Sequence, residues 1–184
     1  MCSGLGMSMA WRFGRGGFRV ALVSRSAARH GTYLRDLASL GIDATAHTAD
    51  VTDRDRLRSV LAEIGWDGSI ALAYYGPGPT QQPIPITEMD MATAQSAFEW
   101  VWPAVDVVRE VLPGMLDDGD GGLLFAGGLS SVERGEIHAM VTADPQRIGS
   151  PDGHTLDPDR LADTAWGMYR TRDRAEEVFD AFGG

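Results

Sequence analysis

Two short stretches near the start of the chain carry residue types suited to binding a phosphorylated nucleotide. Gly4 and Gly6 lie in a glycine turn that leads into a predicted helix, and Ser24-Arg25-Ser26 follows a short apolar segment. The first backbone N–H groups of a helix have no partner inside it, so a pyrophosphate can bind there where glycines permit a close approach. An arginine just beyond the next strand is suited to a 2′-phosphate. The residues predicted to bind a dinucleotide at this end are Gly4, Gly6, Met7, Ser24, Arg25 and Ser26.

The elements that would position these residues alternate between helices and short apolar strands. Hydrophobic spacing and helix-ending glycines predict helices over residues 7–13, 32–40, 54–64 and 91–116, and strands over 19–24, 44–49, 69–75 and 123–126. Pro103 predicts a kink or break in the last helix. The strand over 19–24 is apolar throughout, which predicts burial on both faces. This order is typical of an α/β fold with a doubly wound, mostly parallel sheet.

Composition narrows the functional classes. A chain of 184 residues that is 43% hydrophobic is expected to form one globular domain. A net charge of −10 argues against nucleic acid or an anionic membrane surface as a partner. The single cysteine, Cys2, fits a reducing, cytoplasmic location. The four histidines are scattered without ligand spacing, so no metal site is expected.

Taken in order, the motifs over about residues 4–131 resemble those of the short-chain dehydrogenase/reductase family. Gly4 and Gly6 match the second and third glycines of the family's Gly-x-x-x-Gly-x-Gly turn. Arg25 resembles the family's basic residue for NADP, and Asp50-Val51 resembles its adenine-contacting pair. The resemblance implies a Rossmann-like fold, an NADP-type cofactor and a small-molecule substrate.

The later motifs extend the resemblance to the catalytic region. Tyr74-Tyr75-Gly76 occupies the place of the family's Asn-Asn-Ala-Gly, and residues 111–116 resemble the end of its long dimer helix. The resemblance implies that Ser130 or Ser131 is the active-site serine and that Trp100 replaces the structural asparagine. It also implies a homo-oligomer formed through the helix over 91–116. Tyr75, Ser130 and Ser131 are the candidate catalytic residues.

The sequence departs from the family in its proton relay. In the family a tyrosine donates a proton to the substrate carbonyl, and a lysine four residues later lowers the pKa of that tyrosine. A free tyrosine titrates near about 10, so it needs a nearby cation to act at neutral pH. This sequence contains no lysine, and no tyrosine is followed four residues later by an arginine. The ordinary Tyr/Lys mechanism is therefore excluded.

Two family elements are also predicted to be missing. Only three residues precede Gly4, which leaves no room for the family's first strand. Only residues 132–136 separate Ser131 from the apolar stretch 137–141, too few for a crossover helix, so a strand there should run antiparallel to 123–126. We therefore expect a single domain over 1–184, truncated at the first strand, with a dinucleotide-fold part over 1–131 and a reduced part over 132–184. We also expect strands 19–24 and 69–75 either to pair directly or to lie too far apart for ladder hydrogen bonds, with no other strand of this chain between them.

Three functions fit these observations. The first is a non-redox biosynthetic enzyme, such as a cyclase, isomerase or lyase, that uses the old dehydrogenase cleft. The second is an NADP-dependent oxidoreductase with another proton donor. The third is a catalytically inactive partner that pairs with a homologue through the helix over 91–116. The missing relay favours the first of these, and Arg25 with Asp50 favours the second.

Overall fold

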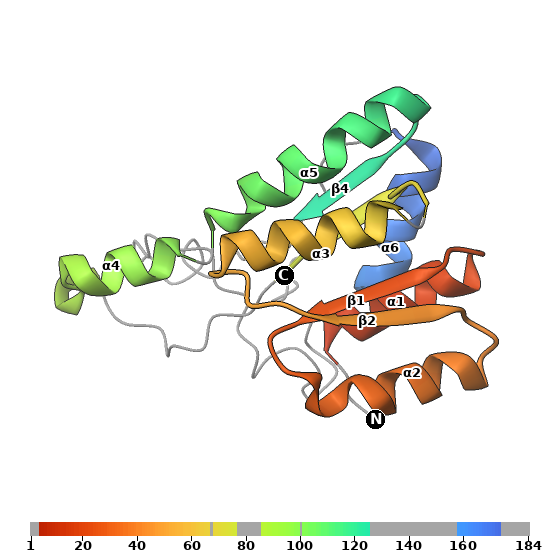
Figure 1. Ribbon diagram of the computed structural model, residues 1–184, viewed down its shortest axis with the longest axis horizontal. Helices are drawn as coiled ribbons and strands as arrows, with labels where there is room; N and C mark the ends of the chain where they lie inside the picture. Colours follow the sequence, from red (N-terminus) through yellow and green to blue (C-terminus); the bar gives the residue numbers. More distant parts are fainter. Residues whose placement is uncertain (1–3, 67, 77–85, 100, 126–157, 174–184) are drawn as a thin grey trace, which may run out of the picture. The chain divides into compact units, whose positions relative to one another are not determined.

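Helices and strands alternate along the described part of the chain. The computed structural model describes residues 4–66, 68–76, 86–99, 101–125 and 158–173 (Figure 1). Its elements in order are α1 (Leu5–Arg15), β1 (Val20–Ser24), η1 (Ala27–Arg29), α2 (His30–Ser39), β2 (Ala44–Thr48), α3 (Arg54–Trp66), β3 (Leu72–Tyr75), η2 (Ile86–Glu88), α4 (Met91–Phe98), α5 (Pro103–Asp118), β4 (Gly122–Phe125) and α6 (Pro158–Thr171). The predicted α/β class is confirmed.

The chain divides into two compact units. The first unit is Met1–Thr48 with Asp144–Gly184, and the second unit is Ala49–Ala143. Each unit has its own parallel pair of strands, β1 with β2 and β3 with β4. The expectation for strands 19–24 and 69–75 concerns two different units and stays a prediction. The single-domain assignment and the truncation stay predictions, and the strand expected after residue 136 lies outside the described residues.

The first unit is built around the sheet of β1 and β2. The two strands pair in parallel from Val20 opposite Ala44 to Ser24 opposite Thr48, with α2 as the crossover between them. Its core joins α1, α2 and the strands through buried Met7, Ala10, Leu37 and Ile42, packed against Trp11, Val20, Leu22, Tyr33 and Ala44. This core lies on one side of β1, because Val20 and Leu22 alternate with residues of the other face.

Burial of β1 on both faces is the one strand prediction that is wrong. Ala21 is exposed, and Val23 is 36% exposed. The helical core covers the face of Val20 and Leu22, and no described element of the first unit covers the opposite face. An apolar run identifies a strand, but it does not show whether a second layer covers it.

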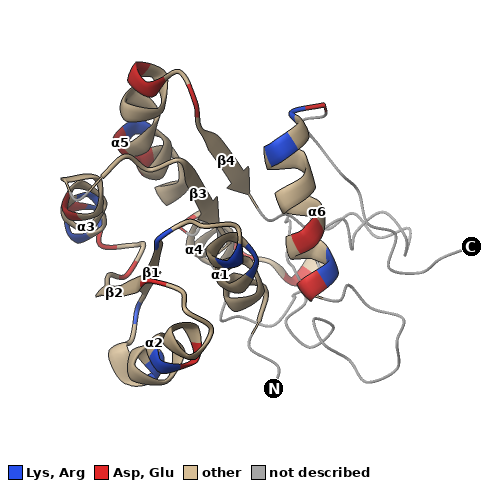
Figure 2. Cartoon of the chain, turned by 90° about the vertical axis from the view of Figure 1, so that its right-hand side faces the viewer, with Lys and Arg blue, Asp and Glu red and all other residues tan. Residues whose placement is uncertain are grey.

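The helix α6 packs on α1 within the first unit (Figure 2). Phe13 and Phe18 make edge-to-face contacts with Trp166 and Tyr169, with ring centroids between 5.2 and 6.1 Å apart. Arg12 forms an ion pair with Asp163 and also lies 4.7 Å from the centre of the Trp166 ring. Residues late in the sequence thereby hold α1, the helix whose first turn carries the glycines.

The second unit packs α3 and α5 against β3 and β4. The strands pair in parallel from Leu72 opposite Gly122 to Tyr75 opposite Phe125. The core is formed by Leu57 of α3 and by Val107, Val111 and Met115 of α5. The expected break in the helix over 91–116 is confirmed, because α4 ends at Phe98 and Pro103 occupies the first turn of α5. None of the described helices combines the length and the apolar composition needed to cross a lipid bilayer.

Candidate nucleotide-binding site

The start of α1 has the geometry that an anion requires. Gly4 is the residue before the helix, and it supplies no side-chain cap to the first N–H groups. Its carbonyl accepts the N–H of Met7 at 2.9 Å. Among the described residues, nothing lies within 4 Å of the place where a Cβ would lie on Gly4 or Gly6. The helix start therefore faces open space, which a pyrophosphate could enter.

The end of β1 lies at the same end of the first unit as the start of α1. A tight turn over residues 16–19 reverses the chain between the helix and the strand, with Phe18 N–H donating to the Phe13 carbonyl. An 11-residue helix and a 5-residue strand are each about 16 Å long. The two ends are therefore level, and Figure 1 shows the tip of β1 on the side where α1 begins. The predicted pyrophosphate and 2′-phosphate residues thus belong to one end of one unit.

Hydrogen bonds fix the loop that follows β1. The Ser24 hydroxyl donates to the Ser26 carbonyl at 3.1 Å and lies 2.7 Å from Nε2 of His30. The Ser26 hydroxyl accepts the N–H of Ala28 at 3.2 Å and so caps η1. Arg25, between the two serines, is exposed. The loop therefore presents a cation at the surface on an ordered backbone.

The Met7 side chain faces away from this surface. It is only 6% exposed and packs in the core of the first unit with Ala10 and Leu37. Only the backbone of Met7 lies at the helix start, where its N–H is already bonded to Gly4. A cofactor contact by Met7 stays a prediction.

Asp50 and Val51 belong to the second unit. The Asp50 carboxylate accepts hydrogen bonds from the N–H of Thr52 at 3.0 Å and from its hydroxyl at 2.8 Å. Val51 packs against the core of the second unit. Asp53 then caps α3 by accepting the N–H of Arg56 at 3.1 Å. The pair is ordered by the turn before α3, and its role toward adenine stays a prediction.

Tyr75 is the candidate catalytic residue that the structure describes. It ends β3, packs against the second unit's core, and has its ring centroid 6.3 Å from that of Phe125. Burial raises the pKa of Tyr75 to about 12, and burial has the same effect on Tyr74. Such a phenol stays protonated at neutral pH and can donate a hydrogen bond, but it gives up its proton at a high cost. Trp100, Ser130 and Ser131 lie outside the described residues.

The sequence analysis missed a buried ion pair. Asp106 is 1% exposed, and its two oxygens accept hydrogen bonds from Nε and Nη2 of Arg54 at 2.6 and 2.8 Å. These bonds hold the pKa of Asp106 below its ordinary value. The available signal was a lone aspartate between two valines on the apolar face of a helix. Its partner is 52 residues away and gave no local signal.

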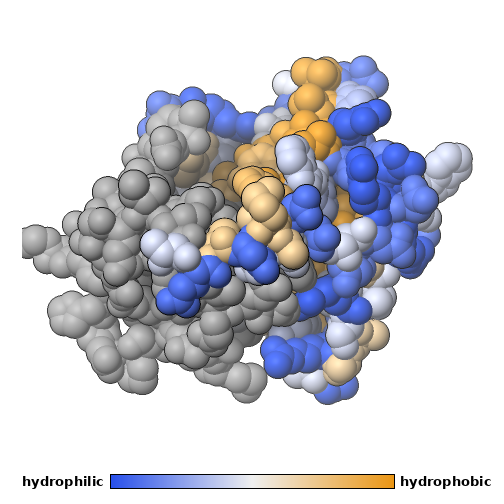
Figure 3. Space-filling view, turned by 90° about the vertical axis from the view of Figure 1, so that its left-hand side faces the viewer, coloured by the Kyte–Doolittle hydropathy of each residue, from blue (hydrophilic) through white to orange (hydrophobic). Residues whose placement is uncertain are grey.

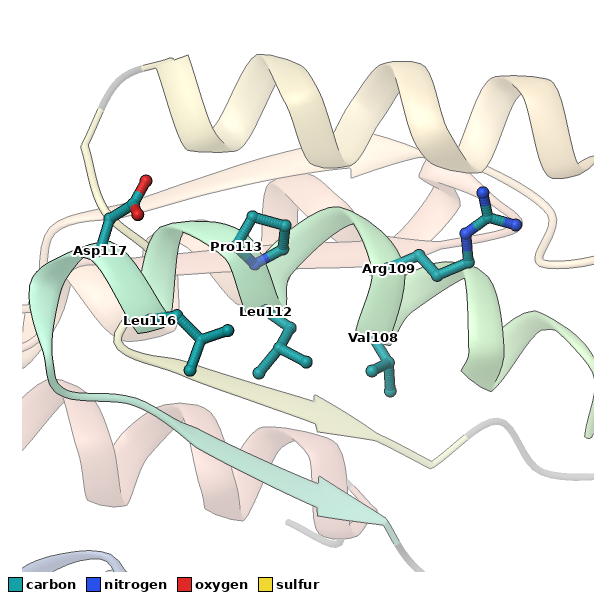
Figure 4. A pocket seen from close by; sticks show the side chains of 6 residues that line it. All are labelled: Val108, Arg109, Leu112, Pro113, Leu116 and Asp117. Carbon is teal, nitrogen blue, oxygen red and sulfur yellow. The ribbon is translucent and has the colours of Figure 1, made fainter.

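An apolar surface extends along α5. Val108, Leu112 and Leu116 point from the same side of this helix into a pocket that Arg109, Pro113 and Asp117 also line (Figure 4). Further exposed apolar side chains continue the surface toward α4; they are Phe98, Val101, Trp102 and Val105. Hydrophobic side chains also reach the surface in the space-filling view (Figure 3). In the described residues no group of three or more metal-ligating side chains occurs.

The parallel strand pairs, the crossover helices and the glycine-led first helix define a Rossmann-like α/β protein. The chain belongs to the short-chain dehydrogenase family, because the sequence profile of that family matches residues 1–140. The resemblance predicted from the order of the motifs is therefore confirmed. No curated protein matches the sequence.

Solved structures show the same fold. A short-chain dehydrogenase/reductase from Burkholderia xenovorans is 24% identical over 72% of this chain and 51% of its own, with a TM-score of 0.65. A metagenomic short-chain oxidoreductase in complex with NADP is 17% identical over 91% of this chain and 86% of its own, with a TM-score of 0.74. The 2-keto-3-deoxy-D-gluconate dehydrogenase of Streptococcus agalactiae is 26% identical over 74% of this chain and 52% of its own, with a TM-score of 0.60. The chain thus spans about half the length of the first and third of these proteins.

Proposed function

We propose that this chain binds NADP(H) through its first unit and acts as an oxidoreductase on a small molecule without a Tyr/Lys relay. The observation that carries the proposal is the placement of the open start of α1 and the Ser24–Ser26 loop at one end of one unit. Gly4 and Gly6 would admit the pyrophosphate to the helix N–H groups. Arg25 would form a charge-assisted contact with the 2′-phosphate.

The charge of residues 4–48, which carry the start of α1 and the Ser24–Ser26 loop, supports an anionic ligand there. Residues 4–48 contain six arginines and two aspartates, although the whole chain has a net charge of −10. Residues 49–125, in contrast, contain four arginines and thirteen acidic residues. The excess of arginine along residues 4–48 attracts anions to this segment, although residues 144–184 of the same unit contain five arginines and nine acidic residues and leave the whole unit without net charge.

The catalytic step must use groups other than the family's usual pair. If NADPH is the cofactor, it would supply the hydride for reduction of a carbonyl carbon, and the chain or solvent would have to supply a proton to the carbonyl oxygen. No lysine is available to lower a tyrosine pKa, and the buried Tyr75 phenol is a poor acid. We infer that Tyr75 at most orients the substrate by a hydrogen bond and that the proton comes from water or from another side chain.

A second candidate function is non-redox catalysis that uses Tyr75 of the second unit. The raised pKa of Tyr75, together with the absence of lysine, favours it, because a neutral phenol can stabilise an enol or oxyanion by hydrogen bonding without losing its proton. For this second function, the site of a cyclase, isomerase or lyase would be lined by Tyr75, by Trp100 and by Ser130 or Ser131. The cofactor would then be absent or would serve only as a structural ligand.

We also propose that the chain self-associates through α4 and α5. Both helices carry exposed apolar side chains, among them Val105, Leu112 and Leu116 of α5. Burying such a surface against a second copy would remove it from water. The same surface would serve the third alternative, an inactive partner of a homologue.

Ligand-dependent stability tests the cofactor proposal. NADPH at a concentration far above its Kd is expected to raise the unfolding temperature of the purified chain more than NADH does, because it binds the folded state with one more charged contact. No shift with either dinucleotide would contradict cofactor binding.

The rate of NADPH oxidation distinguishes the proposed oxidoreductase from the proposed non-redox enzyme. The purified chain would be mixed with NADPH and a panel of ketones and quinones while the cofactor absorbance is followed. Steady oxidation that depends on the carbonyl compound supports the oxidoreductase. Binding of NADPH without turnover of any carbonyl compound favours the non-redox reaction.

A further inference from the structure

The side chain of His30 contacts Ser24 across the loop that carries Arg25. His30 is the first residue of α2, and its side chain is buried, at 9% exposed. Its Nε2 lies 2.7 Å from the Ser24 hydroxyl, six positions earlier in the chain. The contact joins the end of β1 to the start of α2, so it spans the whole loop that carries Arg25.

Two contacts meet at the Ser24 hydroxyl. It donates to the Ser26 carbonyl at 3.1 Å, and it lies 2.7 Å from Nε2 of His30, which donates or accepts according to its tautomer. Ser24 and Ser26, which flank Arg25, are thereby linked to the buried imidazole of His30.

We propose that His30 is a positioning residue that gives the site its selectivity for a 2′-phosphorylated cofactor, by holding the Ser24–Ser26 loop in the shape that presents Arg25. The inference rests on the proposed function of this loop. A loop already ordered before binding loses less conformational entropy when the phosphate arrives. NADH has no 2′-phosphate, so its affinity should not depend on His30.

Two variants of His30 and one variant of Ser24 test this role. The Kd values of NADPH and NADH are measured by calorimetry, and the selectivity is their ratio. His30→Leu removes the nitrogen that bonds to Ser24 and is expected to lower the preference for NADPH by about three- to tenfold, with NADH binding unchanged. His30→Gln keeps an N–H donor at similar reach and is expected to retain most of the preference. Ser24→Ala removes the hydroxyl that contacts His30 and is expected to lower the preference for NADPH by a similar factor.

A double variant shows whether the effect passes through Arg25. In the Arg25→Ala background, His30→Leu is expected to leave the ratio unchanged, because the group that it positions is gone. An unchanged preference in both His30→Leu and Ser24→Ala would overturn the role of His30 while leaving the cofactor proposal intact. An equal loss of NADPH and NADH affinity would also overturn it, since it would indicate a purely structural residue. If the unmodified chain binds NADPH no better than NADH, the proposed function and this inference both fail.

Discussion

At the scale of single residues, the buried carboxylate of Asp106 stabilises the second unit. Asp106 is nearly inaccessible, whereas the side chain of its partner Arg54 is 62% exposed. Water therefore screens the arginine but not the carboxylate, and the two direct hydrogen bonds supply most of the compensation for burying the charge. The pair joins the start of α3 to the first turn of α5.

Asp106→Asn should destabilise the second unit by about 1–3 kcal/mol at pH 7, because the buried group loses its charge-assisted bonds. The pKa of Asp106 is lowered in the folded state, so this stabilisation is complete above its ordinary value of 3.8. It is lost as the pH falls through the lower folded value, and the difference between the variant and the unmodified chain should shrink there. Urea unfolding at a series of pH values measures both effects. Asp55→Asn is the control, since that carboxylate is 92% exposed, and its loss should cost under about 0.5 kcal/mol.

Tyr75 should behave as a buried phenol and not as an activated acid. Its pKa of about 12 means that phenolate absorbance should be the same in the unmodified chain and in Tyr75→Phe up to about pH 10. The two curves should separate only as the pH approaches 12. Because the folded value is above the unfolded one, Tyr75 should also make the fold less stable as the pH rises from about 10 to 12. Ionisation of Tyr75 near neutral pH would contradict this and would restore it as a proton donor.

At the scale of helices and strands, the close packing of α1 limits its sequence. An added Cβ at Gly14 would overlap the side chain of Ile42, which is itself 6% exposed. Gly114 in α5 has no described atom within 4 Å of that position. Both glycines are therefore in helices, but only Gly14 is closely packed against another side chain.

Gly14→Ala should lower the free energy of unfolding by about 1–3 kcal/mol, because Ile42 must move in a packed core. Gly114→Ala should raise it by about 0.5–1 kcal/mol, because alanine favours a helix and meets no obstacle. Denaturant unfolding of both variants measures the difference. A stabilising effect of Gly14→Ala would show that α1 packs less closely against Ile42 than described.

The elements could be predicted from the sequence because each has a local signal. The periodic apolar residues gave α2 and α3, and Pro103 gave the break before α5. The exposed face of β1 had no local signal, since its cover depends on elements distant in the chain. The candidate site divides in the same way. Gly4 and Gly6 could be predicted from a local glycine turn, and Arg25 from its place just after a strand. The bond from His30 to Ser24 could not, because it depends on how α2 packs against β1.

At the scale of the whole molecule, the exposed apolar surface of α4 and α5 predicts self-association. Leu116 is 71% exposed and lines the pocket on α5. Leu116→Arg should shift the chain toward monomer with little change in the unfolding temperature, since the side chain contributes little to the core. Sedimentation equilibrium measures the state of assembly. Trp66→Arg is the control, because Trp66 is 93% exposed and lies on α3. A mass that stays unchanged in Leu116→Arg would place the interface elsewhere or exclude it.

The most direct test of the cofactor proposal is calorimetric titration of NADPH and NADH into the unmodified chain and into two arginine variants. Arg25→Ala removes the proposed 2′-phosphate contact, and Arg35→Ala removes the same charge from the exposed side of α2. The account predicts tighter binding of NADPH by the unmodified chain and by Arg35→Ala. It predicts that Arg25→Ala loses about 1.5–3 kcal/mol of that preference, or about 10- to 150-fold in the ratio of Kd values. Equal binding of the two dinucleotides, or no binding of either, would contradict the account.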